Sequence, residues 1–269
     1  MAALKKVALA HGSGGRLSRE LVESVFLKIF SNPSLRPLED SAEVKITGAT
    51  LAFTTDSYVV TPVEFPGADI GRVAVCGTIN DLAVKGARPL ALSAGFILEE
   101  GFPGELLERI TASMRRAADE AGVSIVTGDT KVVEKGKADG IFINTSGIGL
   151  IPRGRRLTSS AVKPGDVIIV SGNLADHGVA VMNARNRLGL KGGIKSDAAP
   201  LNGLIEAALK VPGTRAMRDI TRGGLATVLN EVSCACGLTA EVDEEAIPVS
   251  AATRSACALL GLDPVYVAN

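Results

Sequence analysis

The sequence is poor in aromatic residues, cysteine and histidine. Of 269 residues, 3% are aromatic, none is tryptophan, 4 are cysteine and 2 are histidine. A hydrophobic content of 46% still supplies a sizeable core, which must be built mainly from aliphatic side chains. No C-x-x-C pair occurs and the histidines lie far apart in sequence, so a zinc site is not expected. We expect the four cysteines to be buried, reduced thiols: Cys76, Cys234, Cys236 and Cys257.

The chain also lacks an excess of one charge and any long apolar run. Its 29 Lys and Arg residues balance 29 Asp and Glu residues, so no broad basic face for nucleic acid is expected. The first residues, MAALKK, are not the apolar stretch of a signal peptide, and no run is long enough to cross a bilayer. These absences favour a soluble, cytoplasmic protein without a nucleic-acid or membrane partner.

Strand and helix patterns alternate along both halves of the chain. Helical spacing predicts helices over residues 17–30, 69–85, 104–121, 179–188, 201–209, 224–236 and 251–260. Short apolar runs predict strands over residues 44–46, 51–55, 90–98, 123–127, 141–150, 167–170 and 239–242, with 123–127 buried. A charged segment without periodicity follows residue 150, so we expect domains over residues 1–150 and 151–269. The pattern favours an α/β to α+β fold.

Four short segments each place one aspartate beside or inside an apolar run. These aspartates are Asp56, Asp81, Asp129 and Asp219. An unpaired charge in such surroundings is costly. Alone, Asp56 is better explained as a turn or cap residue, but four recurrences of the same chemistry favour a shared role. If the fold brings the four together, the expected partner is Mg²⁺ bound with substrate phosphates.

Residues near these aspartates are suited to phosphate binding. Asn80 lies inside a helix with otherwise apolar faces, where it is either a site residue or a buried hydrogen-bonding residue. Gly128 permits close backbone approach, and Lys131 supplies a positive charge. Arg222 precedes a predicted helix, whose first backbone amides favour anions.

A glycine-rich segment, HGSGGR at residues 11–16, could hold phosphates with its backbone amides. The sequence contains no G-x-x-x-x-G-K-[ST] motif, and no clear strand precedes this segment, so neither a Walker nor a Rossmann site is indicated. A lid over a nucleotide and a disordered N-terminal segment both stay open. His177 is a candidate general base, with a loop histidine at a helix start as the alternative.

Seven motifs occur in a recognisable order: HGSGG (11–15), FTTDS (53–57), CGTIND (76–81), GFILEE (95–100), TGDTKV (127–132), DHG (176–178) and RDITRGG (218–224). Together they resemble the HypE family, the carbamoyl dehydratases of [NiFe]-hydrogenase maturation. The resemblance runs from about residue 9 to the last residue. It implies membership of the superfamily of aminoimidazole ribonucleotide synthetase, selenophosphate synthetase and thiamine-phosphate kinase.

The resemblance implies a two-domain aminoimidazole ribonucleotide synthetase-like fold, a homodimer formed through the N-terminal sheet, and ATP with Mg²⁺ between the domains. The implied metal ligands are Asp56, Asp81, Asp129 and Asp219. The candidate catalytic residues are Asp81, Lys131 and His177. The candidate ATP-binding residues are Gly12, Ser13, Gly14, Gly15, Thr55, Asn80, Gly128, Thr130 and Arg222.

The implied reaction begins with a C-terminal cysteine that a HypF-type carbamoyltransferase has carbamoylated on sulfur. ATP phosphorylates the carbamoyl oxygen, loss of phosphate leaves a thiocyanate, and the cyanide passes to a HypC–HypD scaffold. The family's closing Pro-Arg-Ile-Cys tail is absent, and Cys257 lies in a predicted helix. We therefore expect a truncated chain with an incomplete second domain that cannot modify itself.

Two other functions fit the same residues. One is another ATP-dependent enzyme of the superfamily, either a small-molecule kinase or an amidine-forming synthetase, which would share the aspartates. The other is a maturation scaffold that binds partner proteins without catalysis.

Overall fold

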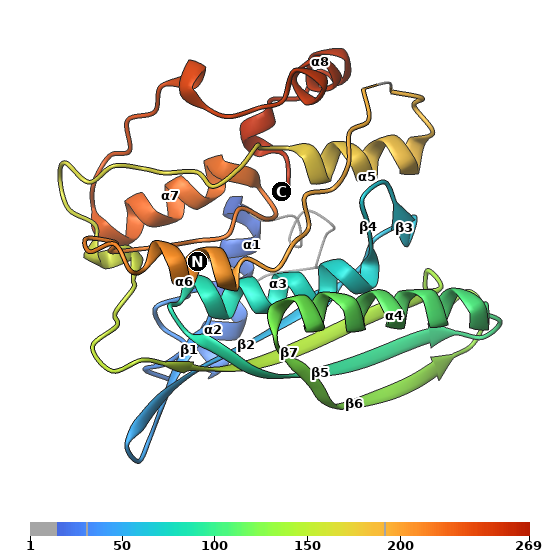
Figure 1. Ribbon diagram of the computed structural model, residues 1–269, viewed down its shortest axis with the longest axis horizontal. Coiled ribbons are helices and arrows are strands. Elements are labelled where there is room, and N and C mark those ends of the chain that lie inside the picture. The colour runs from blue at the N-terminus through green and yellow to red at the C-terminus, as the bar shows by residue number, and fades with distance from the viewer. Residues whose placement is uncertain (1–14, 31, 191) are drawn as a thin grey trace.

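A five-stranded mixed sheet forms the first half of the molecule (Figure 1). The computed structural model describes residues 15–30, 32–190 and 192–269. The strands lie in the order β1 (Ala42–Ile46), β2 (Ala49–Tyr58), β7 (Ile141–Ile151), β5 (Arg88–Glu99) and β6 (Ser124–Val133). Neighbouring strands are antiparallel except β5 and β6, which are parallel. A small separate ribbon pairs β3 (Glu64–Phe65) with β4 (Ala68–Asp69).

Two helices cover one face of this sheet. The side chain of Asp69 caps α3 (Ile70–Val84) by accepting a hydrogen bond from the Arg72 amide at 2.8 Å, which stabilises the helix start by about 1 kcal/mol. Most of α3 is buried, because it packs against the sheet, α4 and the second half of the chain. The amphipathic α4 (Gly104–Ala121) ends at left-handed Gly122, which confirms its predicted bounds.

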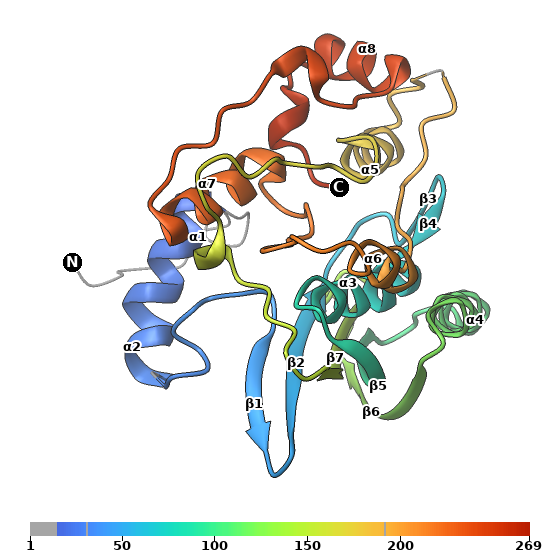
Figure 2. The same ribbon diagram turned by 60° about the vertical axis from the view of Figure 1, so that its left-hand side comes forward.

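The second half is built from helices and long connecting segments above α3 (Figure 2). The predicted helices are confirmed as α5 (Asp176–Asn186), α6 (Asn202–Ala208), α7 (Gly224–Cys236) and α8 (Ala251–Leu260). A helix from Gly15 to Phe30, with a π-helical turn at Val22–Phe26 between α1 (Gly15–Leu21) and α2 (Leu27–Phe30), confirms the first prediction. A core between α5 and α8 includes Val179, Ala180, Ala256 and Cys257.

Three strand predictions need correction. Residues 167–170 and 239–242 form no strand, and the side chains of Val167 and Ile169 are 84% and 89% exposed. Their apolar patterns are typical of strands, but a strand needs a hydrogen-bonding partner, and the structure gives these segments none among the described residues. The predicted short buried strand at 123–127 is instead the ten-residue β6, which is exposed because it forms the sheet edge.

The cysteine prediction is correct for two of the four residues. Cys76 and Cys257 are buried, and burial raises the pKa of the Cys76 thiol to about 12. Cys234 is exposed and Cys236 partly exposed on α7, because this helix turns only part of its surface toward the core. All four are free thiols. None of the helices in the described ranges has the length and apolar character needed to cross a membrane.

One connecting segment, residues 194–202, ties the two halves together across α3. The Ser196 amide donates to the Pro66 carbonyl at 2.8 Å, and the Leu201 amide donates to Asn80 Oδ1 at 2.8 Å. These bonds fix the second half over the helix that carries Asn80. Residues of the second half are therefore kept in a fixed position next to α3.

The contact between α3 and α4 depends on Gly71. A Cβ atom at this position would lie 2.6 Å from the Ile110 carbonyl oxygen and 2.8 Å from Met114 Cγ. We expect Gly71→Ala to be less stable than the matched Gly104→Ala by about 1–3 kcal/mol, because Gly104 begins α4 with open space around it. Both changes gain helix propensity, so the difference between their thermal unfolding curves isolates the steric clash. Equal unfolding temperatures would contradict the close packing.

Candidate metal and nucleotide site

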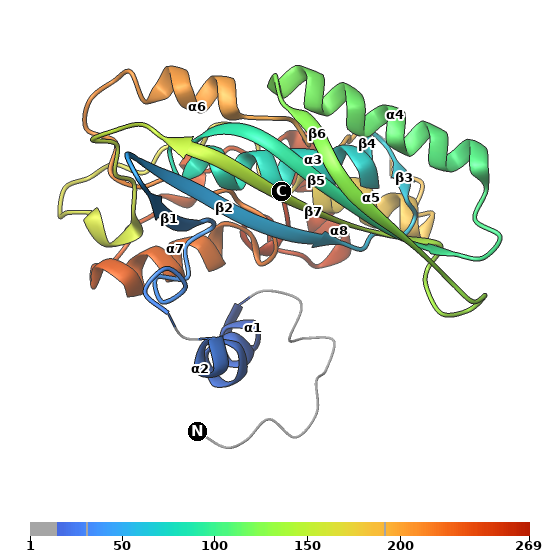
Figure 3. The ribbon, with the colours of Figure 1, turned by 90° about the horizontal axis from the view of Figure 1, so that it is seen from below.

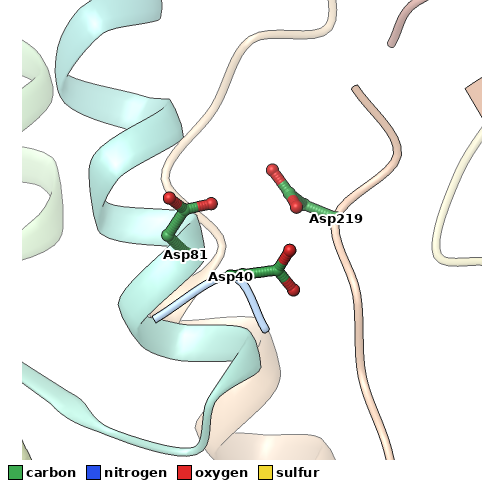
Figure 4. A group of neighbouring side chains, drawn as sticks. All are labelled: Asp40, Asp81 and Asp219. Carbon is green, nitrogen blue, oxygen red and sulfur yellow. The ribbon is translucent and has the colours of Figure 1, made fainter. Parts of the chain in front are cut away.

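Three aspartates converge between the two halves of the chain (Figure 4). Asp40 comes from the segment before β1, Asp81 from α3, and Asp219 from the segment before α7. One carboxylate oxygen from each lies within 4.8 Å of the others. Carboxylate oxygens are the ligands that Mg²⁺ and other hard cations prefer, so the donor set fits a divalent ion.

A threonine on β2 holds this cluster together. Thr54 Oγ1 lies 2.8 Å from Asp81 Oδ2 and 3.0 Å from the Asp40 carbonyl oxygen. The single hydroxyl proton of Thr54 is shared between these two acceptor oxygens. Ser41 Oγ adds a hydrogen bond of 3.0 Å to the Asp81 carbonyl. The segment before β1, strand β2 and helix α3 are thus fixed at one point.

The carboxyl groups of the cluster have raised pKa values. Burial raises the pKa of Asp81 well above its usual range, and the charges of Asp219, Asp56 and Asp40 raise it further. Burial and the charge of Asp219 raise the pKa of Asp40 to about 8, and burial with the charge of Asp56 raises that of Asp219 to about 6. Like charges gathered out of water favour neutralisation by protons or by a cation.

Arg218 partly balances this charge. Its Nε lies 2.7 Å from Asp40 Oδ2, and its Nη2 donates to Glu231 Oε2 at 2.7 Å. The contact with Asp40 is an ion pair without hydrogen-bond geometry, since Arg218 Nε has no hydrogen-bond partner. The Arg218 side chain is 14% exposed, so these pairs are poorly screened by water. One guanidinium shared between two carboxylates leaves Asp81 and Asp219 for a further cation.

Asp56 lies close to the cluster on β2. Its charge raises the pKa of both Asp81 and Asp219, and its Oδ2 accepts a hydrogen bond of 2.9 Å from Tyr58 Oη. Burial and the Asp56 charge raise the pKa of Tyr58, so this phenol stays protonated and donates. Asp56 therefore stands at the edge of the group of three carboxylates, and not within it.

Asp129 does not join the cluster within one chain. The sheet register aligns Ser57, Asn144, Gly95 and Asp129 in one row across four strands. The adjacent row contains Thr145, whose Oγ1 donates to the Ala74 carbonyl on α3, so the side chains of that row face the helices. Because neighbouring rows face opposite sides of a sheet, Asp129 points to the other face, which no helix of the described residues covers.

Three strand spacings, about 14 Å, also separate β6 from β2. The expectation that four aspartates converge is therefore wrong for Asp129 in a single chain. Side chains in a strand alternate between faces, and the sequence did not indicate which face carries Asp129.

Lys131 and Thr130 share β6 with Asp129. Lys131 Nζ lies 3.0 Å from Asp129 Oδ2, with both side chains 71% exposed. The lysine lowers the pKa of Asp129 through a hydrogen bond and its charge. A Cβ on Gly128 would lie 2.2 Å from the Ala94 carbonyl oxygen, so the missing side chain serves the close approach of β6 to β5.

The remaining predicted residues occupy several places. Asn80 uses its side-chain amide to hold the crossing segment, donating to the Ala199 carbonyl at 3.1 Å, which matches the hydrogen-bonding alternative. Thr55 lies on the open sheet face, where its Oγ1 accepts a hydrogen bond of 2.9 Å from Ser146 Oγ. Arg222 is exposed in the loop before α7, and Gly15 begins α1. Gly12, Ser13 and Gly14 lie outside the described residues.

His177 lies in the first turn of α5, and its contacts are with residues other than the three clustered aspartates. Its Nδ1 is 2.9 Å from Ser196 Oγ, and its ring meets Phe65 edge-on with ring centres 5.6 Å apart. Burial lowers the pKa of His177 and keeps the imidazole neutral. A role as general base stays a prediction.

Asp40 is the site residue that the sequence did not indicate. It follows Pro37, Leu38 and Glu39 in a segment without periodic hydrophobicity, and its neighbours resemble an ordinary polar loop. The one available signal was an acidic pair, Glu39 and Asp40, a few residues before the predicted strand at 44–46.

Comparisons with known proteins identify the family of this chain. The sequence models of the AIR synthase related protein match in both parts, with the N-terminal domain over residues 38–151 and the C-terminal domain over residues 163–269. The carbamoyl dehydratase HypE of Rhodobacter capsulatus is 53% identical over 268 residues, which cover 98% of this chain and 79% of that protein. This chain belongs to the HypE family.

Two crystal structures extend the likeness. One, of a HypE–HypF complex, has a TM-score of 0.88 at 50% identity and covers 93% of this chain and 81% of that chain. Another, of HypE in complex with ATP, has a TM-score of 0.80 at 48% identity and covers 98% of this chain and 79% of that chain. The resemblance and the two-domain fold predicted from the motifs are confirmed.

The raised pKa values predict an unusual pH dependence of stability. An aspartate whose folded pKa exceeds its unfolded value of about 3.9 binds more protons when folded, so stability falls as pH rises through the folded value. With folded pKa values of about 8 for Asp40 and about 6 for Asp219, we expect the metal-free protein to lose stability between about pH 5 and about pH 8.

Thermal unfolding in a chelator checks this expectation. Asp81→Asn removes one of the buried charges and should reduce the loss by at least about 1 kcal/mol. Asp129→Asn is the matched control, because Asp129 is exposed and paired with Lys131, and it should keep the wild-type slope. An unchanged slope in Asp81→Asn would contradict the assigned electrostatics.

Proposed function

We propose that this protein is an ATP- and Mg²⁺-dependent carbamoyl dehydratase that converts an S-carbamoyl cysteine into a thiocyanate for [NiFe]-hydrogenase maturation. The observation that carries the proposal is the meeting of Asp40, Asp81 and Asp219 between the two halves. The family membership supports the chemistry, since HypE relatives are named carbamoyl dehydratases and one has been solved with ATP.

Asp40, Asp81 and Asp219 would hold the ion, and the charge of Asp56 on β2 would add to the negative potential around it. Bound Mg²⁺ would offset the charge of the phosphoryl group that is transferred from ATP. Thr54 fixes the Asp81 carboxylate, and Arg218 fixes that of Asp40, so the ligands are positioned before the ion arrives. Binding of the ion requires Asp40 and Asp81 to release their protons.

The reaction removes the elements of water from an amide. The carbamoyl oxygen is a poor leaving group until it receives the γ-phosphoryl group of ATP. Departure of that oxygen as phosphate, with both protons lost from nitrogen over the two steps, leaves S–C≡N. Asp81 is buried and Asp40 and Asp219 are partly buried, so the site would limit the access of water to the phosphoryl group.

The open face of the sheet supports a homodimer (Figure 3). Phe53, Ile97 and Ile148 are 46%, 43% and 39% exposed, which is unusual for apolar side chains of sheet strands. Asp129 and Lys131 belong to this sheet's outer strand, so a second copy bound here would lie against them. We keep both as site residues of the dimer, together with Gly128, Thr130 and Thr55.

The proposed partners follow from the family. A HypF-type carbamoyltransferase would supply the carbamoyl group, as the solved HypE–HypF complex suggests, and a HypC–HypD scaffold would receive the cyanide. The glycine-rich segment at Gly12–Gly15 and the neutral His177 are proposed as a closing loop and a proton acceptor.

Metal-dependent nucleotide binding tests the site. In calorimetric titrations we expect wild-type protein to bind ATP with Mg²⁺ and to lose at least tenfold in affinity in a chelator, with about 1.4 kcal/mol for each tenfold change. Asp81→Asn should show the same loss. Asp119→Asn, an exposed aspartate paired with Arg115 on α4, is the control and should bind normally. Unchanged binding by Asp81→Asn would refute the site.

The dehydratase activity has a separate test. An S-carbamoylated peptide ending in Pro-Arg-Ile-Cys, incubated with the protein, ATP and Mg²⁺, should lose the mass of one water molecule. ATP binding without this loss would favour a kinase or synthetase of the superfamily.

A further inference from the structure

Positive charge is segregated on one part of the surface. Residues 152–163 and 209–215 contain six basic residues and no acidic residue, although the whole chain has zero net charge. The basic residues are Arg153, Arg155, Arg156, Lys163, Lys210 and Arg215. The two segments lie on either side of the domain junction and come together in the fold.

They form the walls of a groove of about 390 Å³. The first wall contributes Pro152 and Leu157, and the second contributes Leu209, Val211 and Pro212. Val211 is 66% exposed, so an apolar side chain faces solvent at this groove. The groove thus combines a few aliphatic residues, of which Leu157 is buried, with three arginines, and no aromatic residue lies among the described residues that line it.

Two ion pairs fix the walls. Arg155 Nη1 contacts Glu206 Oε2 at 2.8 Å and the Gly86 carbonyl at 3.1 Å. Arg215 Nε contacts Asp166 Oδ2 at 2.9 Å, while its carbonyl accepts a hydrogen bond of 3.0 Å from the Thr158 amide on the opposite wall. These contacts fix the shape of the groove, and only two of the six basic residues, Arg155 and Arg215, are paired in them.

The charges on the rim are available to a partner. Arg153 and Arg156 are exposed, and within the described residues neither forms an ion pair. Two exposed arginines without a carboxylate partner among those residues therefore lie close together on the rim, and this charge favours an anionic partner.

We propose that this groove docks an acidic segment of a partner protein, with an apolar side chain of that segment seated against Val211. Carboxylates of the segment pair with Arg153 and Arg156. A protein segment fits better than nucleic acid, because single-stranded nucleic acid is bound through aromatic stacking surfaces and no aromatic residue is among the described residues that line this groove. The inference is independent of the ATP-dependent chemistry.

A peptide-binding measurement on the full chain tests the proposal. The probe is a fluorescein-labelled decapeptide with six Glu or Asp residues around a central Leu, followed by fluorescence anisotropy. We expect binding that weakens as salt is raised, at least tenfold weaker binding of the version with Gln and Asn, and weaker binding when the central Leu becomes Gly.

The matched variants locate the binding surface. Arg153→Glu with Arg156→Glu should weaken binding at least tenfold. Lys135→Glu with Lys137→Glu makes the same charge change at the other end of β7, about 35 Å away, and should bind like wild type. Both proteins should keep the wild-type unfolding temperature and Mg²⁺-dependent ATP binding.

Three outcomes would overturn the proposal. They are equal affinity for the acidic and the neutral peptide, equal affinity of the arginine variant and wild type, and displacement of the peptide by single-stranded DNA at equal or lower concentration. The last result would assign the surface to nucleic acid.

Discussion

The repulsion among buried carboxylates around α3 is the constraint on which the arrangement of this protein depends. Asp81 occupies a helix that is otherwise almost entirely apolar, and Asp40 and Asp219 approach it from opposite ends of the sequence. Without a compensating cation, the charges of Asp219 and Asp40 raise the pKa of Asp81, and the charge of Asp219 raises the pKa of Asp40. Carboxylates that repel one another stay close together only when the packing of the surrounding elements is favourable enough to offset the repulsion. Here that packing is the burial of α3 against the sheet, α4 and the second half.

The same helix explains why the two halves form one site. Its first turns pack against α4 through Gly71, its middle faces the sheet, and its last turns meet α6 in a cluster of Ala83, Val84 and Ile205. The segment crossing α3 adds two hydrogen bonds between its backbone and the Asn80 side chain. Cation ligands from both halves are therefore brought to a common helix, and an ion bound there would stabilise the association of the halves by mass action.

Sequence patterns predicted the first half well because its elements obey simple periodicities. The amphipathic helix ending at Gly122 and the two strands that pair as β1 and β2 were evident from local signals. Strand predictions failed at residues 167–170 and 239–242, where apolar runs lack a partner strand among the described residues. An apolar run indicates that a segment tends to be buried. Whether it forms a strand depends on a second segment, elsewhere in the chain, with which its backbone can pair.

The candidate site was predicted in part for similar reasons. Asp81 and Asp219 were indicated by charge within apolar surroundings, and Asp56 lies close by. Asp40 was missed because no periodic pattern surrounds it. Asp129 was misplaced because a strand alternates its side chains between two faces, and the register that selects the face is a property of the whole sheet.

The edge position of β6 has a consequence for solubility. An outer strand presents unpaired backbone groups that can recruit strands from other molecules, and the exposed valines at positions 126 and 132 would add to that tendency. Between them stand Asp129 and Lys131, whose opposite charges must both be desolvated before a foreign strand can align. The ion pair therefore disfavours aggregation through the edge strand β6.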